Sequence, residues 1–160
     1  MIERDGDRPD VSTEGPQRQL TQRSSPELWG RLVFEAMKQA GIVEGHSAVS
    51  PASSRALFLI GTERATNPET SLAPSDSRLE PVHIHGVDDT SIHLCLPRER
   101  AEEAVANGWA VPHQYGDFGT ELLVFGPRDD RELKVVIELI ADSLDFARSA
   151  SEARRETRLH

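Results

Sequence analysis

Apolar residues recur at helical spacing along the stretch 24–41, which reads SSPELWGRLVFEAMKQAG. Pro26 suits the first turn of a helix, and Ser24 with Glu27 has the spacing of a capping box. Gly41 is placed to end the helix. The sequence therefore predicts an amphipathic helix from about Pro26 to just before Gly41. Its apolar stripe follows the 3.6-residue period: Leu28, Leu32, Val33, Ala36, Met37 and Ala40.

Two later stretches show the same helical pattern. The segment RERAEEAVANG predicts a helix that starts at Pro97 and ends near Asn107 and Gly108. A final helix is predicted to begin at Pro127, because acidic residues favour the positive N-terminal end of a helix. These acidic residues are Asp129, Asp130 and Glu132. The apolar stripe of this helix consists of Leu133, Val136, Ile137, Ile140 and Leu144.

Short apolar runs between turn residues predict the strands. RALFLIG at 55–61 indicates a buried strand that pairs with a shorter strand around 48–50, and TELLVFG at 120–126 indicates another. The stretch PVHIHGVDDTSIHLCL at 81–96 predicts a hairpin of two strands. The order is helix, four strands, helix, strand, helix. It predicts an α+β fold, a mostly antiparallel sheet with about three helices packed on one face.

The ends of the chain and one internal stretch are markedly polar. Residues 1–23 carry few large apolar side chains and are predicted to be a disordered N-terminal tail. Residues 149–160 are predicted to be a C-terminal tail or a frayed continuation of the last helix. One domain remains between them, at 24–148. Residues 62–78 form a long polar loop, either disordered or a lid over a site, and its lack of aromatic residues favours disorder.

The hairpin at 81–96 sorts into two faces, because successive strand residues point to opposite sides of a sheet. On the first arm, apolar residues alternate with His83 and His85, and on the second arm they alternate with His93 and Cys95. If the apolar residues face the helices, the three histidines and Cys95 share the opposite face. A register with His85 opposite His93 would gather all four side chains into one patch.

Composition and charge exclude several classes of protein. The net charge of −9 argues against a general nucleic-acid binder, which would present a basic face. No apolar run approaches the length needed to span a bilayer, so no membrane association is predicted. The single cysteine allows no internal disulfide, and the N-terminus lacks the apolar core of an export signal. A cytoplasmic protein of unknown oligomeric state follows.

Three interpretations of the histidine face remain open from the residues alone. Three imidazoles converging from a rigid sheet could bind a transition metal, with His83, His85 and His93 as ligands. The same face could provide an acid or base near neutral pH for a metal-free reaction. It could also be a polar sheet face whose histidines bond to one another, to water or to a covering loop.

Several segments in the second half of the chain resemble the luciferase-domain family of bacteria and fungi. The resemblance is carried by EPVHIHG (80–86), SIHLCLP (91–97), the following helix to residue 109, PH (112–113), LLVFGPRDDREL (122–133) and ADSLDFA (141–147). It extends over about residues 28 to 148 and is more specific in the second half. Carried over by position, it singles out His83, His85, His93, Trp109, His113, Pro127 and Arg128.

The chain departs from the family pattern near two of these residues. Gly86 stands where a proline is usual, and GWAVPHQY lacks both the acidic residue of the family motif Gly-Trp-Gly-Glu and the proline after His113. Glu80 or Glu121 could replace the missing acidic residue.

The resemblance implies an enzyme that acts on a small molecule. The fungal luciferase oxidises a hydroxylated pyrone with molecular oxygen and is regarded as needing no added cofactor. Similarity therefore implies an oxygenase-like oxidoreductase for a hydroxylated aromatic or pyrone-type substrate, with no cofactor expected and a transition metal as the alternative. The other function class is a non-catalytic module that binds a metal or small ligand through His83, His85 and His93.

Roles follow for the residues that the resemblance and the pattern single out. His85, His93 and His113 are the candidate catalytic residues, His85 or His93 as the base. Substrate binding is assigned to His83, Trp109, Tyr115 and Arg128. Trp109 has an alternative role as a core anchor, and Arg128 as the partner of an acidic neighbour. Cys95 is most simply a small buried apolar residue.

Overall fold

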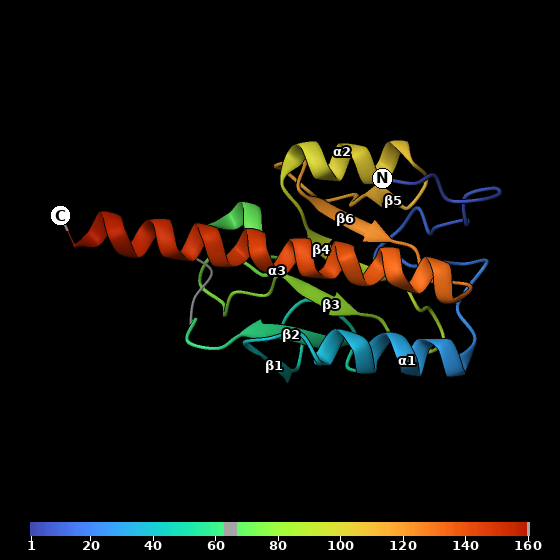
Figure 1. Ribbon diagram of the computed structural model, residues 1–160, viewed down its shortest axis with the longest axis horizontal. Helices are drawn as coiled ribbons and strands as arrows, with labels where there is room; N and C mark the ends of the chain where they lie inside the picture. Colours follow the sequence, from blue (N-terminus) through green and yellow to red (C-terminus); the bar gives the residue numbers. More distant parts are fainter. Residues whose placement is uncertain (63–66, 160) are drawn as a thin grey trace.

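The chain forms three helices and six strands that alternate along the sequence (Figure 1). The computed structural model describes residues 1–62 and 67–159. The helices are α1 (Pro26–Met37), α2 (Arg98–Ala106) and α3 (Asp130–Arg158), with a short 3₁₀ helix, η1 (Pro68–Thr70). The strands are β1 (Ile42–Gly45), β2 (Arg55–Leu59), β3 (Val82–Ile84), β4 (Ile92–Cys95), β5 (Ala110–Pro112) and β6 (Glu121–Val124).

The six strands form one sheet in the order β1-β2-β3-β4-β6-β5, and every neighbouring pair is antiparallel. The predicted α+β fold with helices on a mostly antiparallel sheet is confirmed. In Figure 1, α3 crosses the sheet between α1 and α2, and its C-terminal turns extend beyond the sheet. The side chains of all three helices meet those of the central strands in one apolar core.

Several elements differ from those predicted. The first strand lies at 42–45 instead of around 48–50, because Gly41 at φ 71° redirects the chain into β1 directly after α1. A further strand, β5, occupies part of the predicted loop after α2. The last helix begins at Asp130 instead of Pro127, since the Asp129 side chain caps it by accepting from the Glu132 amide. It continues to Arg158, through most of the predicted C-terminal tail.

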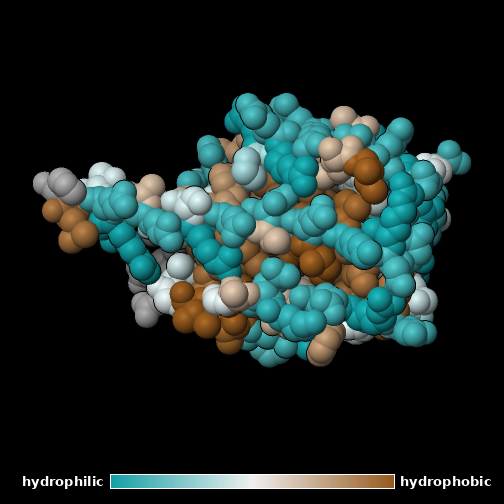
Figure 2. Space-filling model, viewed as in Figure 1, coloured by the Kyte–Doolittle hydropathy of each residue, from teal (hydrophilic) through white to brown (hydrophobic). Residues whose placement is uncertain are grey.

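Alternation along β3 and β4 separates the core from the opposite face of the sheet. Val82, Ile84, Ile92 and Leu94 are fully buried in the cluster formed with the helices. The view of the helical face in Figure 2 is mostly hydrophilic, with apolar residues visible between the helices. Among the residues that the structure describes, no helix is both long enough and apolar enough to cross a membrane.

The N-terminal segment 1–23, for which the composition predicts disorder, lies against the domain. Arg4, Gln17 and Gln19 are buried. The amide of Gln19 donates to Asp89, and its side-chain oxygen accepts from the Gly126 amide. Tertiary hydrogen bonds thus hold this polar segment in place of apolar contacts, and such bonds leave no hydrophobic pattern in the sequence.

Residues 63–66 of the polar loop 62–78 lie outside the described residues. From residue 67 onward the segment packs on the domain: Thr70, Ser71 and Ala73 are buried, and the amide of Leu72 donates to the carbonyl of Glu80 over 2.8 Å. In the described part of this loop, η1 contacts α3, and the residues after it lie beside the start of β3.

Gly126 lies where a side chain has no room. A β-carbon at this position would come within 2.5 Å of the carbonyl oxygen of Thr90 and 2.9 Å of Ser24 Oγ. We expect Gly126→Ala to lower the free energy of unfolding by about 1–3 kcal/mol, because backbone atoms would have to shift. Chemical denaturation followed by circular dichroism measures the change.

Gly30 provides the matched control for this substitution. It lies within α1, and a β-carbon there meets no atom of the described residues within 4 Å. Gly30→Ala should raise the stability by up to about 1 kcal/mol, since alanine loses less backbone entropy in a helix. If both variants shift stability in the same direction and by the same amount, the proposed clash at Gly126 is refuted.

Candidate active site

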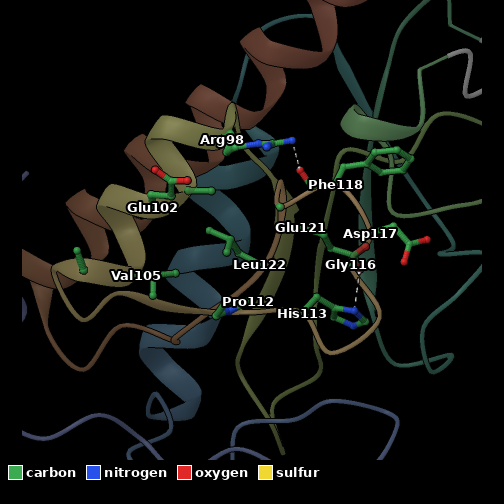
Figure 3. A pocket seen from close by; sticks show the side chains of 13 residues that line it. Arg98, Glu102, Val105, Pro112, His113, Gly116, Asp117, Phe118, Glu121 and Leu122 are labelled. Atoms are coloured by element: carbon green, nitrogen blue, oxygen red, sulfur yellow. Dashed lines mark hydrogen bonds and ion pairs between the residues drawn. The ribbon is translucent and has the colours of Figure 1, made fainter.

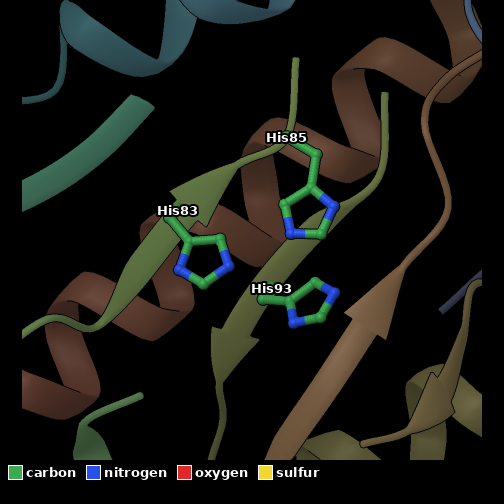
Figure 4. A group of neighbouring side chains, drawn as sticks. All are labelled: His83, His85 and His93. Atoms are coloured by element: carbon green, nitrogen blue, oxygen red, sulfur yellow. The ribbon is translucent and has the colours of Figure 1, made fainter. Parts of the chain in front are cut away.

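Three histidines from the β3–β4 hairpin project into one space (Figure 4). His83 of β3 lies directly opposite His93 of β4, and His85 follows at the end of β3. All three side chains are at least 95% buried. Because the apolar residues that alternate with them face the helices, the histidines occupy the opposite face of the sheet.

The register of this hairpin differs by two residues from the one that would place His85 opposite His93. His85 does not face His93; its amide donates to the carbonyl of Ser91 over 2.9 Å, which closes the turn. Cys95 lies opposite Glu121 of β6 instead of opposite a histidine. A shift of two residues keeps every side chain on its own face, so the histidine cluster forms in either register.

The imidazole rings lie in contact with one another. Ring centres are 4.5 Å apart for His85 and His93, 5.0 Å for His83 and His93, and 5.2 Å for His83 and His85. His113, from the loop after β5, places its ring 5.0 Å from that of His93 in an edge-on arrangement. Four imidazoles from two separate parts of the chain therefore share one site.

One nitrogen of each hairpin histidine is fixed by a hydrogen-bond partner. His83 Nδ1 lies 2.8 Å from Glu80 Oε1, and His85 Nδ1 bonds to Asp89 Oδ2. His93 donates to the backbone carbonyl of Gln17. A carboxylate or a carbonyl only accepts, so in each neutral ring the proton is assigned to this nitrogen. The Nε2 atoms, which lie on the side of the cluster, then carry lone pairs.

Glu80 is fully buried beneath this cluster and is held as a carboxylate. Besides His83, it accepts hydrogen bonds from Ser47 Oγ and from the amide of Ala48 at 3.1 Å. Burial acts to raise the pKa of Glu80, but the bonds from His83 and Ser47 outweigh it and keep the pKa below its usual value. Glu80 thus places a fixed negative charge behind His83.

Asp89 plays the same part behind His85. Its Oδ1 accepts from the amide of Gln19 at 3.1 Å and from the hydroxyl of Ser91 at 2.7 Å. Burial opposes the charge here as well, and the bonds from His85 and Ser91 outweigh it, so the pKa of Asp89 lies below its usual value. The turn of the hairpin and the N-terminal segment together hold this carboxylate.

Burial favours the neutral imidazole at His83, His93 and His113. It lowers the pKa of His83 and of His113 and lowers that of His93 well below its usual value, and neighbouring imidazoles add to the effect at His93 and His113. Near neutral pH these rings are therefore hydrogen-bond acceptors at one nitrogen and donors at the other.

His113 and Glu121 form a second polar pair beside the cluster. His113 Nδ1 accepts from the amide of Tyr115 at 3.2 Å and lies 3.2 Å from Glu121 Oε1. Burial, helped by the charge of Asp117, raises the pKa of Glu121 to about 7. With Nδ1 accepting, neutral His113 carries its proton on Nε2 and can donate it to a ligand.

A cavity of about 290 Å³ opens onto this group of side chains. Its inner wall is formed by the four histidines and Glu121, and its outer wall by three separate segments of the chain. These are the N-terminal segment, the loop after β1 and the described part of the 62–78 loop, which contribute Pro16, Gln17, Val49, Ser50, Pro51 and Leu72. Tyr115 completes the lining. The buried Gln17 Oε1 has no hydrogen-bond partner within the part of the chain that the structure describes, so it adds an acceptor beside the cavity.

Residues 78–143 match the model of the luciferase domain. Over these residues the match confirms the resemblance to the luciferase-domain family that the sequence shows. The luciferase domain spans the β3–β4 hairpin, α2, β5, β6 and the first half of α3. All four clustered histidines therefore lie within it.

Fungal proteins named luciferase are similar to a larger part of the chain. The luciferase of Armillaria mellea is 27% identical and that of Armillaria gallica 26% identical, each over 89% of this chain and 59% of the relative. The luciferase of Armillaria ostoyae is 29% identical over 58% of this chain and 38% of the relative. The chain thus spans less than two thirds of the length of these relatives. No solved structure matches it.

Two predicted substrate-binding residues lie away from the cavity of the luciferase domain. Trp109 is buried in the helical core, and its indole donates to the carbonyl of Ile2 over 2.7 Å. Arg128 forms an ion pair with Glu132 at the start of α3. Neither lines the cavity. Both take the structural roles that were their alternatives, core anchor and partner of an acidic neighbour.

The other predicted site residues do line the cavity of the luciferase domain. His83, His85, His93 and His113 form its inner wall, and Tyr115 lies at its mouth with 70% of its surface exposed.

Sequence reasoning missed or underrated the polar residues that support the histidines. Asp89 lies in the turn of the predicted hairpin, and its place four residues after His85 is the signal that points to its role. Gln17 lay in a segment assigned to disorder and gave no signal. Glu80 and Glu121 were considered only as replacements for a missing acidic residue, and the structure places both beside histidines.

A second cavity of about 540 Å³ lies on the other side of His113 and Glu121, which line both spaces (Figure 3). Its wall is mainly apolar, with side chains from α2, β5 and β6 that include Ala101, Val105 and Leu122. Phe118 and Arg98 lie at its edge, where Arg98 donates to the carbonyl of Phe118. The polar site thus has an apolar space next to it.

Proposed function

We propose that this protein is a luciferase-like oxidoreductase that oxidises a hydroxylated aromatic or pyrone-type molecule with molecular oxygen. The observation that carries the proposal is the convergence of four imidazoles on one cavity within the luciferase domain. The Armillaria relatives named luciferase support the same reaction class.

The proposed reaction begins with loss of the substrate hydroxyl proton to a cavity imidazole, at Nε2 of His85 or His93. The resulting anion is electron-rich at carbon and forms a carbon–oxygen bond with O₂, which is reduced to a bound peroxide. The imidazolium returns its proton to the peroxide oxygen, so the step is balanced as substrate plus oxygen. Asp89 orients His85 and stabilises the transient positive charge on it.

His113 is suited to a different role in the same reaction. Its Nε2 proton can be donated to the substrate oxygen and stabilise the negative charge that develops there. The apolar second cavity lies beside the His113–Glu121 pair and offers space for the remainder of a substrate longer than the first cavity. His83 and Tyr115 would contact the substrate from the wall and the mouth of the site.

Oxygen uptake by the purified protein with a panel of hydroxypyrones and catechols tests this function. We expect uptake with at least one class, and a loss of at least about 100-fold in kcat/KM for His85→Ala and for His93→Ala, the scale of general base catalysis. His46→Ala is the matched control, because His46 is an exposed histidine that does not line the cavity.

Two outcomes would refute the proposed function. One is full activity in folded His85→Ala and His93→Ala proteins, with folding verified by circular dichroism and thermal unfolding. The other is binding of these molecules without any oxygen uptake. That result would support the second candidate, a non-catalytic module that holds a metal or small ligand on His83, His85 and His93. The unpaired, buried Nε2 atoms of His83 and His93 favour this candidate specifically.

A further inference from the structure

We propose that Nε2 of His83, His85 and His93 bind one divalent transition-metal ion at the inner end of the cavity. The three nitrogen atoms available to a metal lie within 4.8 Å of one another. The rings come from two adjacent strands of the same sheet, so their backbones are held at fixed separation. Three histidine ligands with an open position are a common arrangement of catalytic zinc and other divalent transition metals.

The hydrogen bonding of the cluster is the first argument for an ion. Nε2 of His83 and of His93 is buried and has no hydrogen-bond partner among the described residues, although buried polar atoms nearly always have one. With the protons on the other nitrogens, all three Nε2 atoms carry lone pairs that face the same region. Lone pairs repel one another unless a proton donor or a cation lies between them.

The partners of the outer nitrogens are the second argument. Histidines that bind metals usually donate their other ring proton to a carboxylate or a backbone carbonyl, which fixes the ring and makes it a stronger ligand. Glu80 serves His83 in this way, Asp89 serves His85, and the Gln17 carbonyl serves His93. The two carboxylates also supply two negative charges that compensate those of a divalent ion.

The imidazole side chains must move for the arrangement to close on an ion, because all three ring planes lie within 27° of one another. Zinc–nitrogen bonds of about 2.0–2.1 Å at tetrahedral angles place the ligand nitrogens about 3.4 Å apart. In this structure the three nitrogens lie within 4.8 Å of one another. His83 and His85 are nearly parallel, with 6° between their planes. Because a lone pair lies in the plane of its ring, coordination must turn at least one of these two rings.

A fourth position faces the open part of the cavity. His93, His113 and Glu121 form a second group whose ligand atoms also lie within 4.8 Å of one another. His113 donates from Nε2 and is therefore suited to a metal-bound water or substrate oxygen instead of to the metal itself. The ion would then be open to a ligand on the side where the cavity lies.

The catalytic role of this ion rests on the proposed function, but the binding of the ion can be tested without it. A bound ion lowers the pKa of a coordinated hydroxyl group and stabilises its anion. The ion, instead of His85 or His93, would then promote loss of the proton from the substrate hydroxyl group. Metal binding itself needs neither substrate nor oxygen, so it can be measured separately.

Metal titration of chelator-treated protein without an affinity tag is the decisive experiment. We expect wild-type protein to bind about one equivalent of Zn²⁺ or Co²⁺ in calorimetry, with visible absorption from bound cobalt. Zinc should also raise the melting temperature, because it binds the folded state. His83→Ala and His93→Ala should bind at least about tenfold more weakly, and Glu80→Gln about 10–100-fold more weakly, since its partner orients a ligand.

His46→Ala again provides the control and should bind like wild type. The proposal is overturned if wild-type protein takes up neither ion, or if the folded cavity variants bind as tightly as the control. Zinc-induced stabilisation of wild type is the readout that stays valid if a cavity variant fails to fold. Metal binding without any oxygen uptake would overturn only the proposed oxidation. Oxygen uptake by chelator-treated protein that binds no metal would overturn only the metal site.

Discussion

Replacing Asp89 with alanine is expected to lower the free energy of unfolding by about 3–5 kcal/mol, the cost of removing one partner of a buried charged pair. Asp89 accepts hydrogen bonds from His85, from the amide of Gln19 and from both the amide and the hydroxyl of Ser91. The substitution leaves these donors buried without a partner. Urea denaturation of the two proteins measures the difference.

The same substitution should also change the site. Without Asp89 the His85 ring loses the group that orients it, and the N-terminal segment loses its bond at Gln19. We expect faster proteolysis of residues 1–23 in Asp89→Ala than in wild type. Asp88→Ala is the control, because Asp88 is the exposed neighbour in the same turn, and it should change stability by no more than about 0.5 kcal/mol. Equal stability of both variants would show that the Asp89 network contributes little.

Glu121→Gln is expected to stabilise the protein above neutral pH and to have little effect in acid. The pKa of Glu121 is about 7 in the folded protein and 4.5 as its ordinary value. Between these pH values the folded state holds a proton that the unfolded state has lost, so stability falls as pH rises from about 4.5 to 7. The full difference corresponds to up to about 3 kcal/mol, and glutamine abolishes it.

Denaturation of metal-free wild-type and variant proteins between pH 4 and pH 8 tests the direction of this pH dependence of stability. The stability of Glu121→Gln relative to wild type should rise through this window and level off above it. Glu102→Gln, which changes an exposed carboxylate on α2, should follow the wild-type curve. A constant difference between Glu121→Gln and wild type across the window would mean that Glu121 titrates at its ordinary pKa.

The histidine cluster shows what the alternation of side chains along a strand can predict and what it cannot. Parity along the hairpin placed His83, His85 and His93 on one face, and the structure has them there because side chains alternate in any strand. Alternation does not fix the register, which depends on the hydrogen bonds of the turn that join His85 to Ser91. A difference of two residues in register changes which histidines face each other but not which face they occupy.

The N-terminal segment shows where composition misleads. Its few large apolar residues predict disorder, yet Gln19 is 1% exposed and bonds to Asp89 and Gly126. The Gln17 backbone fixes His93, so a segment assigned to a tail supplies part of the site. Specific polar contacts between distant residues have no periodicity, and a single sequence gives no sign of them.

By itself the sequence determined the α+β class, three helices close to their predicted positions, the resemblance to the luciferase-domain family and the face that carries three histidines. These depend on periodicity and on short motifs, which act locally along the chain. Only the tertiary structure brought His113 and Glu121 to this face, placed Glu80 and Asp89 behind the rings and sent Trp109 and Arg128 elsewhere. The physical reason is that burial and hydrogen bonding between distant segments decide which polar groups meet. The protonation and ligand-binding capacity of the imidazoles follow from those contacts.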